Sequence, residues 1–225
     1  MPLKLEVDGR IRAVGSTIFH VSSAWLAHII VDKGFRGRGL GRAMTEALIE
    51  RARNHGAKSI QLVATEMGEP LYKKLGFRNT GEYTFMKGGR TTTIPEGSVP
   101  YQARYREQLF ALDQRASGEY RQQLLEPHLN NAQLLVENRL LGFHMPTLGE
   151  GLIVAETEVA GHALMRQKHS REWLYTAVPR DNTSALNLLK NLGHQEYRVG
   201  KRMLLGPDVC WRPEMIFGRI GGNLG

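Results

Sequence analysis

Residues 35–42 read Phe-Arg-Gly-Arg-Gly-Leu-Gly-Arg, a basic and glycine-rich stretch between two apolar patterns. Trp25 to Val31, before it, is nearly continuously apolar, which is typical of a central strand covered on both faces. Gly41 to Asn54, after it, has apolar residues at helical spacing and predicts an amphipathic helix. Several glycines at a helix start let backbone N–H groups converge near the positive end of the helix dipole. The stretch therefore predicts a phosphate or pyrophosphate site.

Two well-known phosphate-binding loops do not fit this stretch. It does not match the Walker A pattern GxxxxGK[ST], and the third glycine of GxGxxG is missing after Gly39 and Gly41. Taken alone, a glycine-rich string also fits an ordinary basic surface turn. After the helix, Ile60 to Ala64 reads as another apolar strand. Strand, glycine turn, helix and strand together form a βαβ unit, which predicts that the two strands run parallel in one sheet.

The positive charge is concentrated in the first part of the chain. The 225 residues carry a formal net charge of +8; residues 1–90 hold 15 basic and 8 acidic side chains, against 15 and 14 in residues 91–225. Diffuse nucleic-acid binding favours a longer basic stripe with exposed aromatic residues. The compact basic cluster argues against a nucleic-acid partner and for a small phosphorylated ligand.

Composition excludes several protein classes. With 41% hydrophobic and 23% charged residues, the chain suits one large or two small domains and not a disordered protein. The longest apolar run, Ala24 to Val31, is far shorter than the roughly 20 residues of a membrane span. The N-terminus lacks the apolar region of a signal peptide, and the single Cys210 cannot form an internal disulfide or a cysteine metal cluster. We expect a cytoplasmic protein with no metal site and no membrane partner.

The remaining patterns predict alternating strands and helices on both sides of a glycine- and proline-rich segment, Gly88 to Pro100. We expect strands at Leu3–Val7, Arg12–His20, Tyr83–Met86, Ala132–His144 (a hairpin), Gly151–Ala155, Trp173–Val178 and Arg198–Leu205. We expect helices at Pro70–Leu75, Tyr105–Leu129 (two helices), Glu158–His169 and Thr183–Leu192.

An internal repeat suggests two related domains. Residues 72–77, Tyr-Lys-Lys-Leu-Gly-Phe, match residues 189–194, Leu-Lys-Asn-Leu-Gly-His, at an offset of 117 positions. Strands are expected before and after the helix in both places. The fold class is therefore α/β (α+β), with domains at 1–90 and 104–225 joined by a linker at 91–103. Each domain is expected to be a mixed sheet flanked by helices.

These motifs together resemble the GNAT superfamily of N-acetyltransferases. Arg36, Gly39 and Gly41 fill the family's acyl-CoA loop signature R/Q-x-x-G-x-G/A. Residues 29–32, Ile-Ile-Val-Asp, resemble the family's fourth strand, and Leu71-Tyr72-x-x-Leu75-Gly76-Phe77 is similar to its LY-x-x-LGF element. The resemblance covers about Leu3 to Lys87.

The second half resembles the family more faintly. Asp181-Asn182-x-x-Ala185-x-x-Leu188-Leu189 is similar to the element N-x-x-A-x-x-L-Y, with Leu189 in place of the tyrosine. No R-x-x-G-x-G precedes the helix expected at Glu158–His169, and the nearest glycines are Gly149 and Gly151. The chain looks like a bacterial tandem type in which an active-like GNAT domain is followed by a degenerate copy.

The resemblance implies acetyl-CoA as co-substrate and assigns residues to it. Backbone groups of Ile30 and Val31 would hold the pantetheine and acetyl ends, and Thr65, where the family often has asparagine, would hydrogen-bond the cofactor. Pyrophosphate would be bound by backbone N–H groups and arginine charges within Arg36, Gly37, Arg38, Gly39, Leu40, Gly41 and Arg42.

The resemblance also assigns the catalytic roles. In the family an amine attacks the thioester directly in a ternary complex, and no enzyme cysteine is acylated. Tyr72 matches the tyrosine that protonates the departing CoA thiolate; a phenol of pKa about 10 is a usable acid for a thiol of pKa about 8.5. His28 stands near the position of the family's base and would take the ammonium proton, directly or through water. A histidine satisfied within the sheet is the equal alternative for His28.

Three functions remain open at this point. The first is acetyl-CoA-dependent N-acetylation of a primary amine on a small molecule or peptide. The second is a non-catalytic acyl-CoA-binding or regulatory protein, and the third is nucleic-acid binding through the basic half. Family members carry a strand and two helices before the strand expected at Leu3. Part of the acceptor wall is therefore expected from the second domain or from a second subunit, which leaves a homodimer open; a mis-set start codon is the equal alternative.

Overall fold

The computed structural model describes residues 1–89, 97–170 and 175–221. They form two compact units, one of Met1–Thr80 with Lys201–Asp208 and one of Gly81–Gly200 with Val209–Gly221. The first unit thus includes a segment from late in the chain, so the units cut across the linear boundaries predicted at 90 and 104. Residues 91–96 of the predicted linker lie outside the described residues.

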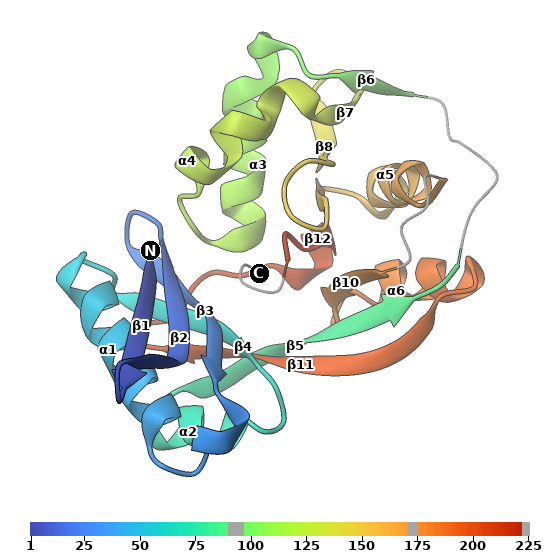
Figure 1. The fold of residues 1–225 in the computed structure, drawn as a ribbon. Helices are drawn as coiled ribbons and strands as arrows, with labels where there is room; N and C mark the ends of the chain where they lie inside the picture. Colours follow the sequence, from blue (N-terminus) through green and yellow to red (C-terminus); the bar gives the residue numbers. More distant parts are fainter. Residues whose placement is uncertain (90–96, 171–174, 222–225) are drawn as a thin grey trace. The chain divides into compact units, whose positions relative to one another are not determined.

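The first unit is built on the predicted βαβ pattern (Figure 1). Its strands β1, β2 and β3 are antiparallel, and β3 runs parallel to β4, as the βαβ pattern predicts. The last residues of β11 pair antiparallel with β4, with Met203 opposite Leu62. The elements are β1 (Pro2–Val7), β2 (Arg10–Phe19), β3 (Ser23–Val31), α1 (Leu40–Asn54), β4 (Ser59–Ala64), α2 (Glu69–Lys74), the first residues of β5 (Arg78–Lys87) and the end of β11 (Gln195–Leu205).

Helix α1 covers one face of this sheet and supplies much of the core. Its apolar face packs against β2 and β3, where Met44 and Leu48 are buried. Gly15 on β2 makes room for the helix, since a Cβ there would lie 2.7 Å from Leu48 Cδ1. Met203 of β11 is buried in the same cluster. The core of the first unit therefore includes a residue from late in the chain.

The second unit has its own core around a five-stranded antiparallel sheet in the order β12-β9-β8-β7-β6. The predicted hairpin is β7–β8, and the predicted helical region 105–129 forms α3, a short α4 and a 3₁₀ turn. Trp173, the expected start of the next strand, lies outside the described residues. The elements are β6 (Ser98–Pro100), α3 (Arg106–Ser117), α4 (Gln122–Leu125), β7 (Gln133–Val136), β8 (Leu140–Met145), β9 (Leu152–Ala155), α5 (Glu158–Ser170), β10 (Tyr175–Pro179), α6 (Thr183–Asn191) and β12 (Ile216–Gly218).

The repeated hexapeptide forms the same helix stop in both units. After α2, Gly76 has φ 90° and the N–H of Phe77 donates to the carbonyl of Tyr72 at 3.0 Å. After α6, Gly193 has φ 85° and the N–H of His194 donates to the carbonyl of Leu189 at 2.9 Å. Both are Schellman-type ends, in which glycine takes the left-handed position. The short sequence match thus reflects an equivalent local structure 117 positions apart.

Candidate functional site

Strand β3 changes its environment halfway along its length. Residues 23–27 are buried, whereas the side chains from His28 to Val31 are exposed or half-buried, and Ile30 is 55% exposed. The prediction that this strand is covered on both faces is therefore wrong for its second half. The reason is that pairing with β4 runs only from Ser23 to Trp25, after which the two strands part. An apolar strand surface is left facing open space.

A bulge sets the course of this exposed half. Ser16 pairs with Ala27 and Val14 pairs with Ile30, so two residues of β3 oppose the single Gly15 of β2. His28, in the bulge, has φ 52°, a left-handed conformation in which histidine is more common than most other residues. Bulges bend a strand and redirect its side chains, often beside active sites. Here the bulge redirects the residues up to Val31.

The segment after β3 is held in place by charge and aromatic contacts. The Oδ1 of Asp32 accepts a hydrogen bond from the N–H of Gly34 at 3.0 Å, and its Oδ2 accepts one from Arg12 at 2.7 Å. These two hydrogen bonds, that from Arg12 first, lower the pKa of Asp32. The guanidinium groups of Arg12 and Arg38 lie 4.0 and 4.7 Å from the centre of the Phe35 ring. The loop is therefore anchored before it reaches the helix.

The start of α1 is open to an anion. Gly37 and Gly39 have φ 77° and 82°, in the left-handed region that favours glycine. Gly39 is the N-cap, so no side chain caps the helix, and the first turn contains no acidic residue. The first N–H groups of a helix have no partner within the helix, and they lie at the positive end of its dipole. This end of α1 is suited to hold a phosphate.

A cleft of about 420 Å³ within the first unit joins the exposed half of β3 to this helix start. Eight predicted site residues line it: Ile30, Val31, Arg36, Gly37, Leu40, Gly41, Thr65 and Tyr72. The sequence-based assignment missed five others as site residues: Ile29, Phe35, Met67, Gly68 and Leu71. Met67 is 72% exposed, and the available signal in the sequence was an apolar residue in the short connection between β4 and α2. The cleft combines an apolar wall with a basic, glycine-rich end.

The arginines of the loop differ in their surroundings. Arg36 lines the cleft and its Nε donates to the carbonyl of Val31 at 3.3 Å. Arg38 stacks on Phe35, and Arg42 pairs with Glu46 at 2.9 Å on the helix surface. Arg38, Gly39 and Arg42 are not among the residues that line the cleft. Arg36 is therefore the cleft-lining arginine of the three.

Tyr72 is half-buried on α2 at the other end of the cleft. Its ring meets Phe77 edge-on at 5.9 Å between centroids, and a Cβ on Gly68 would lie 2.9 Å from its Cε2 atom. Burial raises the pKa of Tyr72 above its ordinary value of 10.0. The phenol therefore stays protonated at neutral pH and is available as a hydrogen-bond donor to a thiolate.

His28 occupies a different position from Tyr72. Its side chain is exposed, its Nδ1 lies 3.5 Å from Ser16 Oγ, and it is not among the residues that line the cleft. Its role as the base stays a prediction. The feature that distinguishes His28 in the structure is its left-handed backbone conformation in the bulge.

An ion pair joins helix α2 to β11, a strand from late in the sequence. The carboxylate of Glu69 lies 2.7 Å from Lys73 Nζ and 3.0 Å from Lys201 Nζ. Hydrogen bonds from Lys73 and then Lys201 lower the pKa of Glu69 to about 2, so it is ionised at neutral pH. Lys201 lies opposite Ala64, one position before the cleft residue Thr65. The end of β11 therefore helps to position the helix that carries Tyr72.

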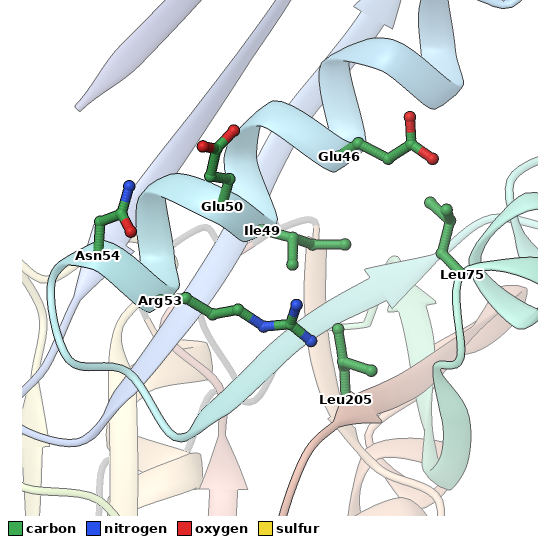
Figure 2. Close-up of a pocket in the computed structure, with 7 residues that line it drawn as sticks. All are labelled: Glu46, Ile49, Glu50, Arg53, Asn54, Leu75 and Leu205. Carbon is green, nitrogen blue, oxygen red and sulfur yellow. The ribbon is translucent and has the colours of Figure 1, made fainter.

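A second hollow of about 330 Å³ lies on the opposite half of α1 (Figure 2). Ile49 extends from the helix toward Leu75 and Leu205, with Arg53 beside them. The hollow shares no lining residue with the cleft that contains Tyr72. Because it has neither the glycine loop nor the tyrosine, we assign it no part in the site.

The described part of the chain contains neither a helix that could span a membrane nor a cluster of metal-ligating side chains. No helix there is long and apolar enough to cross a membrane. No group of three or more histidine, cysteine, aspartate or glutamate side chains there is placed to hold a metal ion.

Two curated proteins align with part of this chain. A glucosamine 6-phosphate N-acetyltransferase from Trypanosoma brucei brucei is 42% identical over 74 residues, which cover 33% of this chain and 47% of that protein. The ribosomal protein bS18 alanine N-acetyltransferase of Salmonella typhimurium is 36% identical over 78 residues, which cover 33% of this chain and 53% of that protein. The chain thus spans about half the length of these relatives.

Solved structures show the same fold over nearly the whole chain. A protein from Pyrococcus horikoshii, classed as an acetyltransferase, superposes with a TM-score of 0.85 at 24% identity, covering 97% of this chain and 78% of that one. A tandem GNAT protein from the clavulanic acid biosynthesis pathway superposes with a TM-score of 0.55 at 14% identity, covering 92% and 83%.

Family models of the acetyltransferase (GNAT) domain match two successive stretches, residues 3–94 and residues 109–218. Members of this family use acetyl-CoA as co-substrate. The predicted family and the predicted tandem arrangement are thereby confirmed. The chain belongs to the GNAT acetyltransferase family and carries two of its domains in tandem.

Proposed function

We propose that the first domain transfers an acetyl group from acetyl-CoA to a primary amine by direct attack in a ternary complex. The observation that carries the proposal is the cleft in which the exposed half of β3, the open start of α1 and Tyr72 meet. The relatives named above act on glucosamine 6-phosphate and on an alanine of a ribosomal protein, and both acceptors present a primary amine. We therefore propose an amine on a small molecule or a peptide as acceptor.

The cofactor would be held along the length of the cleft. Its pyrophosphate would accept hydrogen bonds from the N–H groups of residues 37–42, with Arg36 adding a charge. The apolar surface of Ile30 would cover the pantetheine arm, and backbone groups of Ile30 and Val31 would hold its amides. Thr65 would contribute a hydroxyl hydrogen bond from the β4 side.

Beyond the groups that hold the cofactor, acetyl transfer would need only a proton donor for the thiolate and an acceptor for the ammonium proton. The neutral amine nitrogen forms a bond to the thioester carbonyl carbon, and the carbon–sulfur bond then breaks. The Oη–H of Tyr72 gives its proton to the departing thiolate, and the ammonium proton leaves to His28 or to water. Because burial raises the pKa of Tyr72, the phenol donates only as negative charge develops on sulfur.

We propose that the second domain does not bind the cofactor in this way. Thr157 caps the start of α5, where its Oγ1 accepts from the N–H of Ala160 at 3.2 Å, and Glu158 adds a negative charge there. Gly149, a glycine near the lost loop, has a packing role, since a Cβ on it would lie 1.9 Å from the carbonyl oxygen of Ile220. A capped and acidic helix start is poorly suited to a phosphate.

Thermal unfolding with and without acetyl-CoA tests the cofactor site. Ligand at 100 times its Kd is expected to add about 2.7 kcal/mol of stability. For a chain of this length, that corresponds to a rise in Tm of roughly 5–10 °C. We expect Gly39→Asp to abolish the rise, because a carboxylate would then face the pyrophosphate.

Gly39→Asn is the matched control for this variant. Both side chains tolerate the left-handed conformation, and nothing lies within 4 Å of a Cβ at this position. The neutral variant should keep most of the shift. Equal shifts in the two variants, or no shift in the wild type, would count against the loop as the cofactor site.

Turnover is tested separately, by the release of free CoA thiol. Glucosamine 6-phosphate and a peptide with an N-terminal alanine are the first acceptors to try. Thiol release that depends on the amine supports the proposed transferase. Cofactor binding without amine-dependent release from a wider amine panel would contradict it and favour a non-catalytic acyl-CoA-binding protein.

A further inference from the structure

A polar cavity of about 500 Å³ lies within the second unit. It is lined by side chains from the 3₁₀ turn before β7, from β7 and β8, and from the last part of α5, including Asn130, Asn131, Gln133, His144, Gln167 and Lys168. In the second domain, the start of α5 corresponds to the start of α1, where the phosphate is proposed to bind. This cavity lies at the opposite, C-terminal end of α5. The cavity is therefore not a remnant of a second cofactor site.

Lys168 is the charged centre of the cavity wall. Its side chain is only 2% exposed, and its Nζ donates to two neutral oxygens, the carbonyl of Gly151 at 3.1 Å and the hydroxyl of Thr176 at 3.4 Å. Burial lowers the pKa of Lys168 to about 8, with the charge of Glu150 opposing this effect and that of Arg219 adding to it. An anion in the cavity would stabilise the ammonium form.

Gln167, next to Lys168 on α5, contributes a hydrogen-bond acceptor to the cavity wall. Its Oε1 is buried and has no hydrogen-bond partner among the described residues. A buried amide oxygen is normally hydrogen-bonded, so a donor is needed on the cavity side. The carboxamides and the imidazole of the lining offer further hydrogen bonds to a polar molecule.

The position of Gln167 and Lys168 on α5 favours a singly charged anion. Gln167 and Lys168 lie in the last turn of a helix that ends at Ser170. The negative end of the helix dipole disfavours a doubly charged phosphate there. A singly charged carboxylate is compatible with one lysine at this place.

We propose that this cavity binds a small polar carboxylate that carries an amino or hydroxyl group beside its carboxylate. Lys168 pairs with the carboxylate, and the Oε1 of Gln167 accepts from the neighbouring N–H or O–H. The site is independent of the acetyl-CoA cleft, and its ligand need not be a substrate. Its occupation is expected to stabilise the second unit.

Calorimetric titration and thermal unfolding of the full chain test the proposal with L-serine, L-glutamine and D-gluconate. Inorganic phosphate and glycerol serve as the bare anion and the neutral polyol. We expect at least one carboxylate to bind and to raise Tm, while phosphate and glycerol do not. Binding of the amino acids identifies the amino form, and binding of gluconate identifies the hydroxy form. Absence of binding by all three at millimolar concentration, or equal binding of phosphate, overturns the proposal.

Lys168→Met is expected to weaken carboxylate binding roughly tenfold or more, because hydrogen bonds to charged groups contribute strongly. Lys190→Met, which removes an exposed lysine on α6, is the control and should bind normally. Undiminished binding by folded Lys168→Met overturns the proposal.

A measurement on the wild type does not depend on that variant folding. The side-chain NMR signals of Lys168 report its pKa, which a bound carboxylate should raise from about 8 toward 10.5. Among the described residues, the charged and titratable groups near Lys168 include Glu150, Arg219, His144, His169 and His194, so the titration of the acid and of the histidines is followed in the same experiment. An unchanged pKa of Lys168 at saturating probe overturns the proposal.

Discussion

Tyr72→Phe is expected to lower kcat by about two orders of magnitude or more, while the Kd for acetyl-CoA stays within about twofold of the wild-type value. The substitution removes one hydroxyl from a half-buried ring and leaves the contact with Phe77 in place. The thiolate then departs without a positioned acid, whereas the glycine loop still holds the phosphates. The measurement is steady-state thiol release with an accepted amine, together with calorimetric binding of acetyl-CoA.

The pH profile distinguishes an acid from a packing residue. Because burial raises the pKa of Tyr72, the wild-type rate should not show a tyrosine-dependent fall until pH exceeds about 10. The residual activity of Tyr72→Phe should not show this fall at high pH. Tyr120→Phe, at a tyrosine 52% exposed in the second unit, is the control and should be unchanged. A kcat within threefold of wild type for Tyr72→Phe would remove the tyrosine from the mechanism.

Arg121→Leu is expected to destabilise the protein by roughly 3–5 kcal/mol, which is the usual cost of removing one partner of a buried ion pair. Arg121 and Asp113 have side chains only 1% and 2% exposed, and the guanidinium donates to both carboxylate oxygens, at 3.0 and 2.5 Å. Glu119, 3% exposed, is a further buried acid that acts on Arg121. Without the arginine, two buried carboxylates lose their counter-charge, and Tm should fall by roughly 6–20 °C.

A more exposed pair, formed by Arg115 on α3 and Glu156 before α5, provides the control for Arg121→Leu. Arg115 lies 3.2 Å from Glu156 and is 50% exposed, so Arg115→Leu should cost less than about 1 kcal/mol. Similar Tm losses in the two variants would refute the structural role of the buried pair.

The sequence was most informative where the determining interactions are local. The spacing of apolar residues in α1 and the glycines at its start depend on neighbouring residues, so the helix, the loop and the parallel strand pair were predictable. The same is true of Tyr72, which lies one helical turn before a glycine stop. Eight of the predicted site residues accordingly line one cleft.

The sequence was uninformative where distant partners decide the structure. The exposure of Ile30 depends on where β3 parts from β4, and the apolar pattern alone indicates a fully buried strand. The bulge at His28 depends on the register with β2. The cavity at Lys168 is made by three stretches of chain, residues 130–133, 144–147 and 167–168, and no spacing along the chain predicts that they meet.

The pairing of β4 with the end of β11 has a consequence for synthesis. Gln61 on β4 and Arg202 on β11 are hydrogen-bonded but stand 141 positions apart. At translation rates of about 5–20 residues per second, roughly 7–28 s separate the emergence of the two strands from the ribosome. During that interval the edge of β4 lacks its partner, and such an edge invites pairing with other chains. The domain that carries Tyr72 therefore cannot complete its fold until nearly the whole second domain has been made.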